Sequence, residues 1–163
     1  MKKIIFILPI LLVLNIAQGA SLMTQSMMEE IVKQTASVSN GEKGVVNFTY
    51  NNVRMALISD VKHDRMRIIA VVKKFKALTP QQIEAILNSN FHKSLDARYA
   101  VSKGVLYSAY IHPLSSLRKK QITSAMLQVS NLAKSFGNEY SSGVLRVGGK
   151  KKTSNKNITK DII

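Results

Sequence analysis

The sequence predicts an α+β domain in which helices pack against an antiparallel sheet. Two observations support this class. Apolar residues recur at helical spacing near both ends of the chain, whereas the middle alternates apolar and polar residues, as a strand with one buried face does. Tight-turn signals separate the alternating segments. The predicted order is α-β-β-β-α-β-β-α, and the sheet consists of a three-strand meander plus a hairpin.

A leader precedes the domain. Two lysines stand before an apolar run over residues 4–14, and small residues occupy the positions that a cut after Gly19 requires. This order is typical of a secretory signal peptide, and the run is shorter than the about 20 apolar residues that span a membrane. We expect residues 1–19 to be a signal peptide, with Ala20 as a neighbouring cleavage choice, and the protein to be periplasmic or secreted.

The first element after the leader is an amphipathic helix over residues 21–38. Its apolar residues fall on one helical face, and Glu29 and Glu30 lie on the other. Asn40 and Gly41 readily adopt the left-handed conformation that closes a helix, so we expect a turn over residues 39–41.

Three antiparallel strands follow. Alternation runs over residues 45–50 and 53–58, and the pair Asn51-Asn52 between them predicts a tight hairpin turn. A polar turn over residues 60–65 leads to a third strand over residues 66–73. Because Ile69 and Val71 also lie on its second face, we expect that face to be partly covered.

The second half begins with a helix. Thr79 is its predicted N-cap, Pro80 its first residue, and Ile83, Ile86 and Leu87 its buried stripe. We expect this helix to end near Asn90.

Strands over residues 97–101 and 105–111 then flank a glycine turn. The inward-facing residues of this hairpin are predicted to be Tyr99, Val101, Val105, Tyr107 and Ala109.

A long final helix follows Pro113. It is capped by Ser115 or Ser116 and extends to Phe136, and Gly137 closes it. A short strand over residues 144–147 completes a single domain over residues 20–147. The remaining residues, 148–163, form a lysine-rich tail that we expect to be disordered.

Composition narrows the function classes. The absence of cysteine excludes disulfides, thiolate chemistry and cysteine zinc sites. A formal net charge of +15 favours anionic partners such as an envelope surface or an acidic ligand. Nucleic acid is not expected as a partner, because the chain has no tryptophan and no nucleic-acid-binding motif. No cofactor is expected.

A resemblance becomes visible in the segments "NFHKSLDARYAVSKGVLYSAYIHPLSSL" and "NLAKSFGNEYSSG". Together they resemble the pattern of the bacterial YbjN-type domains, which share the fold of the type III secretion chaperones, and the match covers residues 44–145. The resemblance implies a non-enzymatic domain, often dimeric, that serves protein binding or regulation. It carries no catalytic residues to transfer. The chain departs from secretion chaperones in its export signal and its basic surface.

Asp96 and His112 are the residues that most suggest chemistry. Pairing about the glycine turn brings them near each other, so they could act as metal ligands or catalytic groups. We favour a hydrogen bond between them that fastens the strand ends. Arg98 faces away from the core, where it either pairs with Asp96, buries its stem or contacts a partner. The sequence does not support serine catalysis, because it has no nucleophile-elbow motif and no convergent set of catalytic groups.

The start of the final helix is the best candidate for binding an anion. It groups Ser115, Ser116, Arg118, Lys119 and Lys120 where the helix dipole is positive, although a solvated basic face explains the same cations. The sequence therefore predicts an exported, non-enzymatic protein-binding domain with a protein partner and an option of self-association. The alternative is an electrostatic binder of an anionic envelope surface or acidic ligand, which uses the tail and the cations at residues 118–120.

Overall fold

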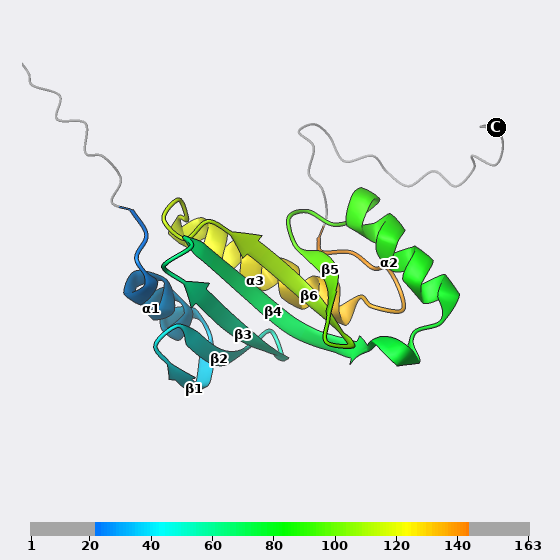
Figure 1. Cartoon of the computed structure of the whole chain (residues 1–163), viewed down its shortest axis with the longest axis horizontal. Coiled ribbons are helices and arrows are strands. Elements are labelled where there is room, and N and C mark those ends of the chain that lie inside the picture. The colour runs from blue at the N-terminus through cyan, green and yellow to red at the C-terminus, as the bar shows by residue number, and fades with distance from the viewer. Residues whose placement is uncertain (1–21, 144–163) are drawn as a thin grey trace, which may run out of the picture.

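A computed structural model describes residues 22–143 and shows one six-stranded antiparallel sheet with helices packed against it (Figure 1). The strands lie in the order β1-β2-β3-β4-β6-β5, so the predicted α+β class is confirmed. The leader, the strand predicted over 144–147 and the tail lie outside the described residues. The elements are α1 (Gln25–Thr35), β1 (Ser37–Glu42), β2 (Val45–Tyr50), β3 (Val53–Asp60), β4 (Arg65–Lys74), a 3-10 turn (Phe75–Ala77), α2 (Pro80–His92), β5 (Arg98–Ser102), β6 (Val105–His112) and α3 (Lys119–Lys134).

The sheet contains one strand more than the sequence predicts. The first helix ends at Thr35, and residues 39–41 belong to the edge strand β1 instead of a helix-closing turn. Every residue of β1 is exposed. The strand has no buried face, so it lacks the alternation by which a strand is recognised in sequence. The chain turns instead at Gly44, whose φ of +93° favours glycine.

Both predicted hairpin turns are confirmed. Asn51 and Asn52 have φ values of 52° and 60°, and they join β2 to β3 with Tyr50 paired to Val53. Lys103 and Gly104 make the corresponding turn between β5 and β6, at φ values of 47° and 73°. Two consecutive positive φ values match the twist of the flanking strands, which fixes the register of each hairpin.

The inward face of β6 differs from the predicted series by one residue. The turn pairs Tyr99 with Ser108, so Leu106, Ser108 and Tyr110 lie beneath the helices, and Tyr107 points to the other face. The polar Ser108 obscured this pattern. Its hydroxyl donates to the Val129 carbonyl at 3.0 Å, which satisfies it inside the core.

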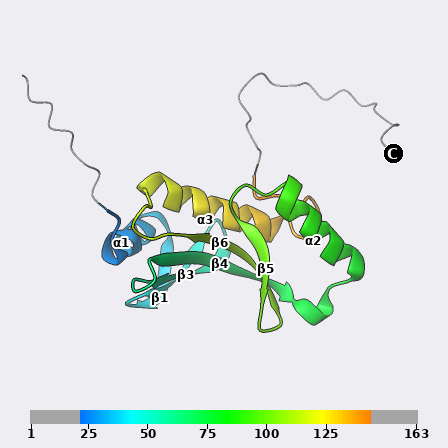
Figure 2. The same ribbon diagram turned by 45° about the horizontal axis from the view of Figure 1, so that its top comes forward.

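Helices α1 and α3 cover the same face of the sheet, and α2 lies beside β5 at its far end (Figure 2). Helix α2 starts as predicted, since the Thr79 hydroxyl accepts from the Gln82 N–H at 3.2 Å. Leu87, predicted to be buried, is 65% exposed. The core lies between the sheet and the helices α1 and α3. Its fully buried side chains include Phe48, Met28, Leu57, Met66, Ile68, Leu106, Ile122, Met126 and Leu132.

Candidate functional site

The stretch from Asn88 to Leu114 is fastened to α3 through Tyr99. The hydroxyl of this residue donates to the Leu132 carbonyl at 2.7 Å, and its ring meets the rings of Phe136 and Tyr140 edge to face. Burial raises the pKa of Tyr99 far above its ordinary value, so the hydroxyl stays a donor. Tyr99 therefore stabilises the fold and is not a reactive group.

Asp96 is fastened differently from the prediction. Its carboxylate accepts from the Gln128 side chain at 3.2 Å, and the predicted hydrogen bond to His112 is not formed. The Gln128 carbonyl oxygen accepts from the backbone N–H groups of Asp96 and Ala97, at 2.8 and 3.1 Å. Gln128 was not singled out from the sequence, because a polar residue in a helical stripe resembles a surface position.

His112 bonds locally. Its Nδ1–H donates to the Pro113 carbonyl at 2.8 Å, and its ring stacks on that of Tyr110. His112 and Asp96 nevertheless line the same surface hollow, together with Arg98 and Lys120. The Arg98 guanidinium donates to the Leu95 and Ala97 carbonyls, and the ion pair with Asp96, one of the alternatives considered for it, is not formed.

This hollow is not arranged for catalysis. Its acid and its arginine are each hydrogen-bonded to structural partners, and no nucleophile lies paired with a base among them. Across residues 22–143, no group of three or more histidine, aspartate or glutamate side chains could hold a metal ion. Of the described helices, none has the length and apolar character needed to span a membrane.

The residues of the predicted anion site are divided between two environments. Helix α3 begins at Lys119 with Arg118 as its N-cap, so neither Ser115 nor Ser116 caps it. Ser115 instead donates its backbone N–H and hydroxyl to the Asp64 carboxylate, at 2.7 and 2.8 Å. The three cations at residues 118–120 are exposed. Charge reversal at these three positions tests whether they bind an anion.

The bonds from Ser115 lower the pKa of Asp64, first through its backbone N–H and then through its hydroxyl. A carboxylate with a depressed folded-state pKa stabilises the fold above its unfolded-state pKa, and this contribution is lost as pH falls through the folded-state value. We therefore expect the melting temperature of Asp64→Asn to fall less steeply than that of the wild type between about pH 5 and pH 2. Parallel melting curves across this range would contradict the assignment.

The face of the sheet opposite α1 and α3 is uncovered among the described residues. Val71 is 66% exposed and Ile111 is 58% exposed, so this face is more exposed than the partial cover that the sequence predicts. We call it the open face. Its residues, read from strand alternation and register, include Glu42, Val45, Asn47, Thr49, Arg54, Ala56, Ile58, Asp60, Arg67, Ile69, Val71, Arg98, Ala100, Tyr107, Ala109 and Ile111.

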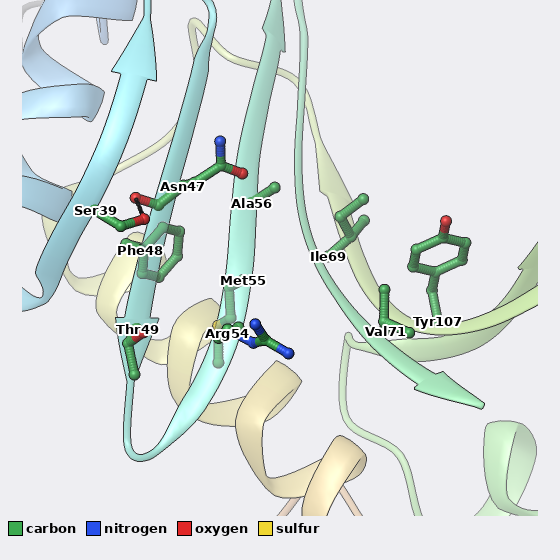
Figure 3. A pocket seen from close by; sticks show the side chains of 10 residues that line it. All are labelled: Ser39, Asn47, Phe48, Thr49, Arg54, Met55, Ala56, Ile69, Val71 and Tyr107. Atoms are coloured by element: carbon green, nitrogen blue, oxygen red, sulfur yellow. Dashed lines mark hydrogen bonds between the residues drawn. The ribbon is translucent and has the colours of Figure 1, made fainter.

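The centre of the open face is apolar. One row of directly paired residues crosses the sheet from Ala56 through Ile69 to Ala109. The small Ala56 beside Ile69 lowers the surface, and Figure 3 shows the side chains of β1, β2, β3, β4 and β6 that line a hollow of about 290 Å³ there. Tyr107 and Val71 lie at one side of it. Sequence reasoning noted the apolar Ile69 and Val71 on this face but read them as a sign of partial cover, and so did not identify the site.

Comparison with known proteins identifies the fold. No protein-family model matches the chain, and no curated protein matches it. Among solved structures, a chain of the HopA1–SchA chaperone–effector complex is similar, with a TM-score of 0.52 and 13% identity over 68% of this chain and 90% of that chain. The ExsC–ExsE complex gives a TM-score of 0.51 at 14% identity over 68% and 87%.

A third similar structure is the Yersinia pestis type III secretion chaperone SycH in complex with a stable fragment of YscM2. Its TM-score is 0.52 at 15% identity, over 69% of this chain and 98% of that chain. These likenesses show that the chain has the fold of the type III secretion chaperones.

Proposed function

We propose that the chain is a non-enzymatic protein-binding domain, chaperone-like or regulatory in kind, whose open face receives a segment of a partner protein. The observation that carries this proposal is the open face itself. Apolar surface that a folded domain leaves uncovered marks interaction sites. Here the apolar row is continuous across β3, β4 and β6, and two of its residues, Ala56 and Ile69, line a hollow.

The similar structures support a protein as the class of partner. SchA is found in a chaperone–effector complex with HopA1, ExsC in a complex with ExsE, and SycH in a complex with a fragment of YscM2. We further propose that the chain is an exported, YbjN-like member of this fold, periplasmic or secreted. The leader pattern at residues 1–19 supports export.

Self-association, if it accompanies binding, has a suitable surface on α2. Leu87 and Phe91 lie one turn apart, and they are 65% and 82% exposed. The helix carries a single acidic residue, Glu84, so two copies would meet with little charge repulsion. We propose that a homodimer forms through this surface. Sedimentation of the purified protein would measure its mass.

The second candidate function is binding of an anionic envelope surface. Its support is the cluster of Arg118, Lys119 and Lys120, which is exposed at the positive end of the α3 dipole. Reversal of these three charges serves below as a matched control, and it also tests this function.

A photo-crosslinking amino acid, placed either on the open face or on the outer side of α3, tests in the producing cells whether the open face binds a partner protein. At Val71, on the open face, we expect a crosslinked protein adduct. At Leu127, which is 45% exposed on the outer side of α3, we expect none. Ile69→Asp should abolish the Val71 adduct, because it places a charge in the apolar row. Equal adducts from both positions, or an adduct indifferent to Ile69→Asp, would sink the proposal.

A further inference from the structure

We infer that the partner segment on the open face is acidic and amphipathic, with apolar side chains flanked by carboxylates. This inference rests on the proposed function and deepens it by naming the chemistry of the partner. It is carried by the charges that surround the apolar row, by the absence of an ion pair to any of them within the described residues, and by the geometry of the strands beneath.

Three arginines surround the apolar floor. Arg67 lies on β4 between Ile58 and Ile111, which are its paired neighbours on β3 and β6. Arg54 lines the hollow on β3, and Arg98 ends the apolar row where β5 pairs with Ala109. All three are exposed. A guanidinium presents a planar fork of donors that matches a carboxylate, so this arrangement favours acidic side chains around an apolar centre.

No carboxylate on the open face forms an ion pair with these arginines within the described residues. The six strands contain two acidic residues, Glu42 at the end of the edge strand β1 and Asp60 at the end of β3. The Asp60 carboxylate is bound to His63 at 2.7 Å. That contact is also the one ion pair found within residues 22–143, so Arg54, Arg67 and Arg98 form none there. An acidic partner would supply what the described chain does not.

The same charges disfavour other occupants. Two copies of the chain placed open face to open face would bring arginines against arginines, which weakens association. The tail cannot complement the face either, because residues 150–152 are all lysine and Lys156 and Lys160 follow, against a single Asp161. A partner of opposite charge is the occupant that the surface fits.

The strands suggest an extended segment. Side chains on one face of a strand recur about every 6.6–6.8 Å, twice the rise per residue, and alternate side chains of an extended peptide recur at the same interval. A segment that runs along β4 could place a carboxylate over Arg67 and apolar side chains over Ile69 and Val71, which are same-face neighbours on that strand. Further carboxylates before or after the apolar side chains then reach the other guanidinium groups.

Fluorescence anisotropy with defined peptides tests the inference on the protein purified from the producing cells. The probe is a capped peptide of about ten residues, roughly 33 Å when extended, in which central leucines are flanked by glutamates on both sides. One comparison peptide replaces glutamate by lysine, and another replaces leucine by serine. We expect the acidic amphipathic probe to bind at least about tenfold more tightly than either, because only it combines both features.

Charge reversal then locates the binding. The triple variant Arg54→Glu, Arg67→Glu and Arg98→Glu should weaken probe binding by at least about tenfold. The matched variant Arg118→Glu, Lys119→Glu and Lys120→Glu changes the net charge equally but lies at the start of α3, where only Lys120 shares a hollow with one of the three arginines, Arg98, and it should change binding by less than about threefold. Thermal unfolding of both variants checks that each remains folded.

Four outcomes would overturn the inference. They are equal binding of the lysine peptide, equal loss in the matched variant, no loss in the open-face variant, or binding of anionic lipid vesicles that depends on Arg54, Arg67 and Arg98 while peptide binding does not. If Ile69→Asp abolishes the Val71 crosslink but reversal of the three arginines does not change it, the proposed protein-binding function stands and the inference of an acidic partner is wrong. If neither change affects the crosslink, the proposed function and the inference are both wrong.

Discussion

Tyr99→Ala lowers the free energy of unfolding by about 3–5 kcal/mol, on the expectation for removing a large buried aromatic side chain. The ring is 5% exposed and packs against Phe136 and Tyr140, with centroids 6.1 and 6.2 Å away. Its loss leaves a cavity between β5 and the end of α3, and it also removes the hydrogen bond to the Leu132 carbonyl. Urea unfolding monitored by circular dichroism measures the change.

Tyr99→Phe is the matched control for this substitution. It keeps the ring and removes only the hydroxyl that donates to Leu132, so we expect a loss of about 1 kcal/mol. Equal losses in the two variants would show that the ring contributes nothing. Wild-type stability in Tyr99→Ala would remove the evidence that the stretch from Asn88 to Leu114 is held to α3 by this residue.

The second large effect is expected from Gln128→Leu, which should destabilise the fold by about 2–4 kcal/mol. Gln128 is 5% exposed, and its side-chain oxygen is the acceptor for two backbone N–H groups, those of Asp96 and Ala97. Leucine has a similar size but no acceptor, so both donors lose their partner, and Ala97 is fully buried.

Ser124→Ala is the control, because it removes only the hydrogen bond that the Gln128 side-chain amide donates to the Ser124 hydroxyl. Ser124 is exposed and accepts only from the Gln128 amide, which also donates to Asp96. We expect its replacement to change stability by less than about 0.5 kcal/mol. If Gln128→Leu is as mild as Ser124→Ala, the connection between α3 and the start of β5 is not what holds Asp96 in place.

Much of the fold could be predicted because its signals are local. The paired asparagines at 51 and 52 specify a two-residue turn wherever they occur between strands, and Thr79-Pro80 specifies a helix start. The strand β1 could not be predicted, because all its side chains are exposed and its existence depends on pairing with β2. The boundaries of α3 were misplaced for a related reason, since Ser115 is bound by Asp64 from a distant turn.

The candidate site was less accessible to sequence reasoning. The residues singled out for chemistry, Asp96 and His112, do line one hollow, yet their hydrogen bonds go to Gln128 and Pro113, which only the tertiary structure reveals. The open face was missed because one misassigned position on β6 turned Tyr107 and Ala109 inward. A shift of one residue moves every side chain of a strand to the opposite face, so this error concealed Ala109, one of the three residues of the apolar row.

The central claim is that a partner segment lies on the uncovered side of the sheet. Nuclear magnetic resonance of the methyl-labelled protein titrated with the acidic amphipathic peptide tests it most directly. We predict that the methyl signals of Ala56, Ile69 and Ala109 shift together, whereas those of Leu87 on α2 and Leu127 on α3 do not. Shifts confined to the helices, with the three open-face methyl groups unchanged, would contradict the claim.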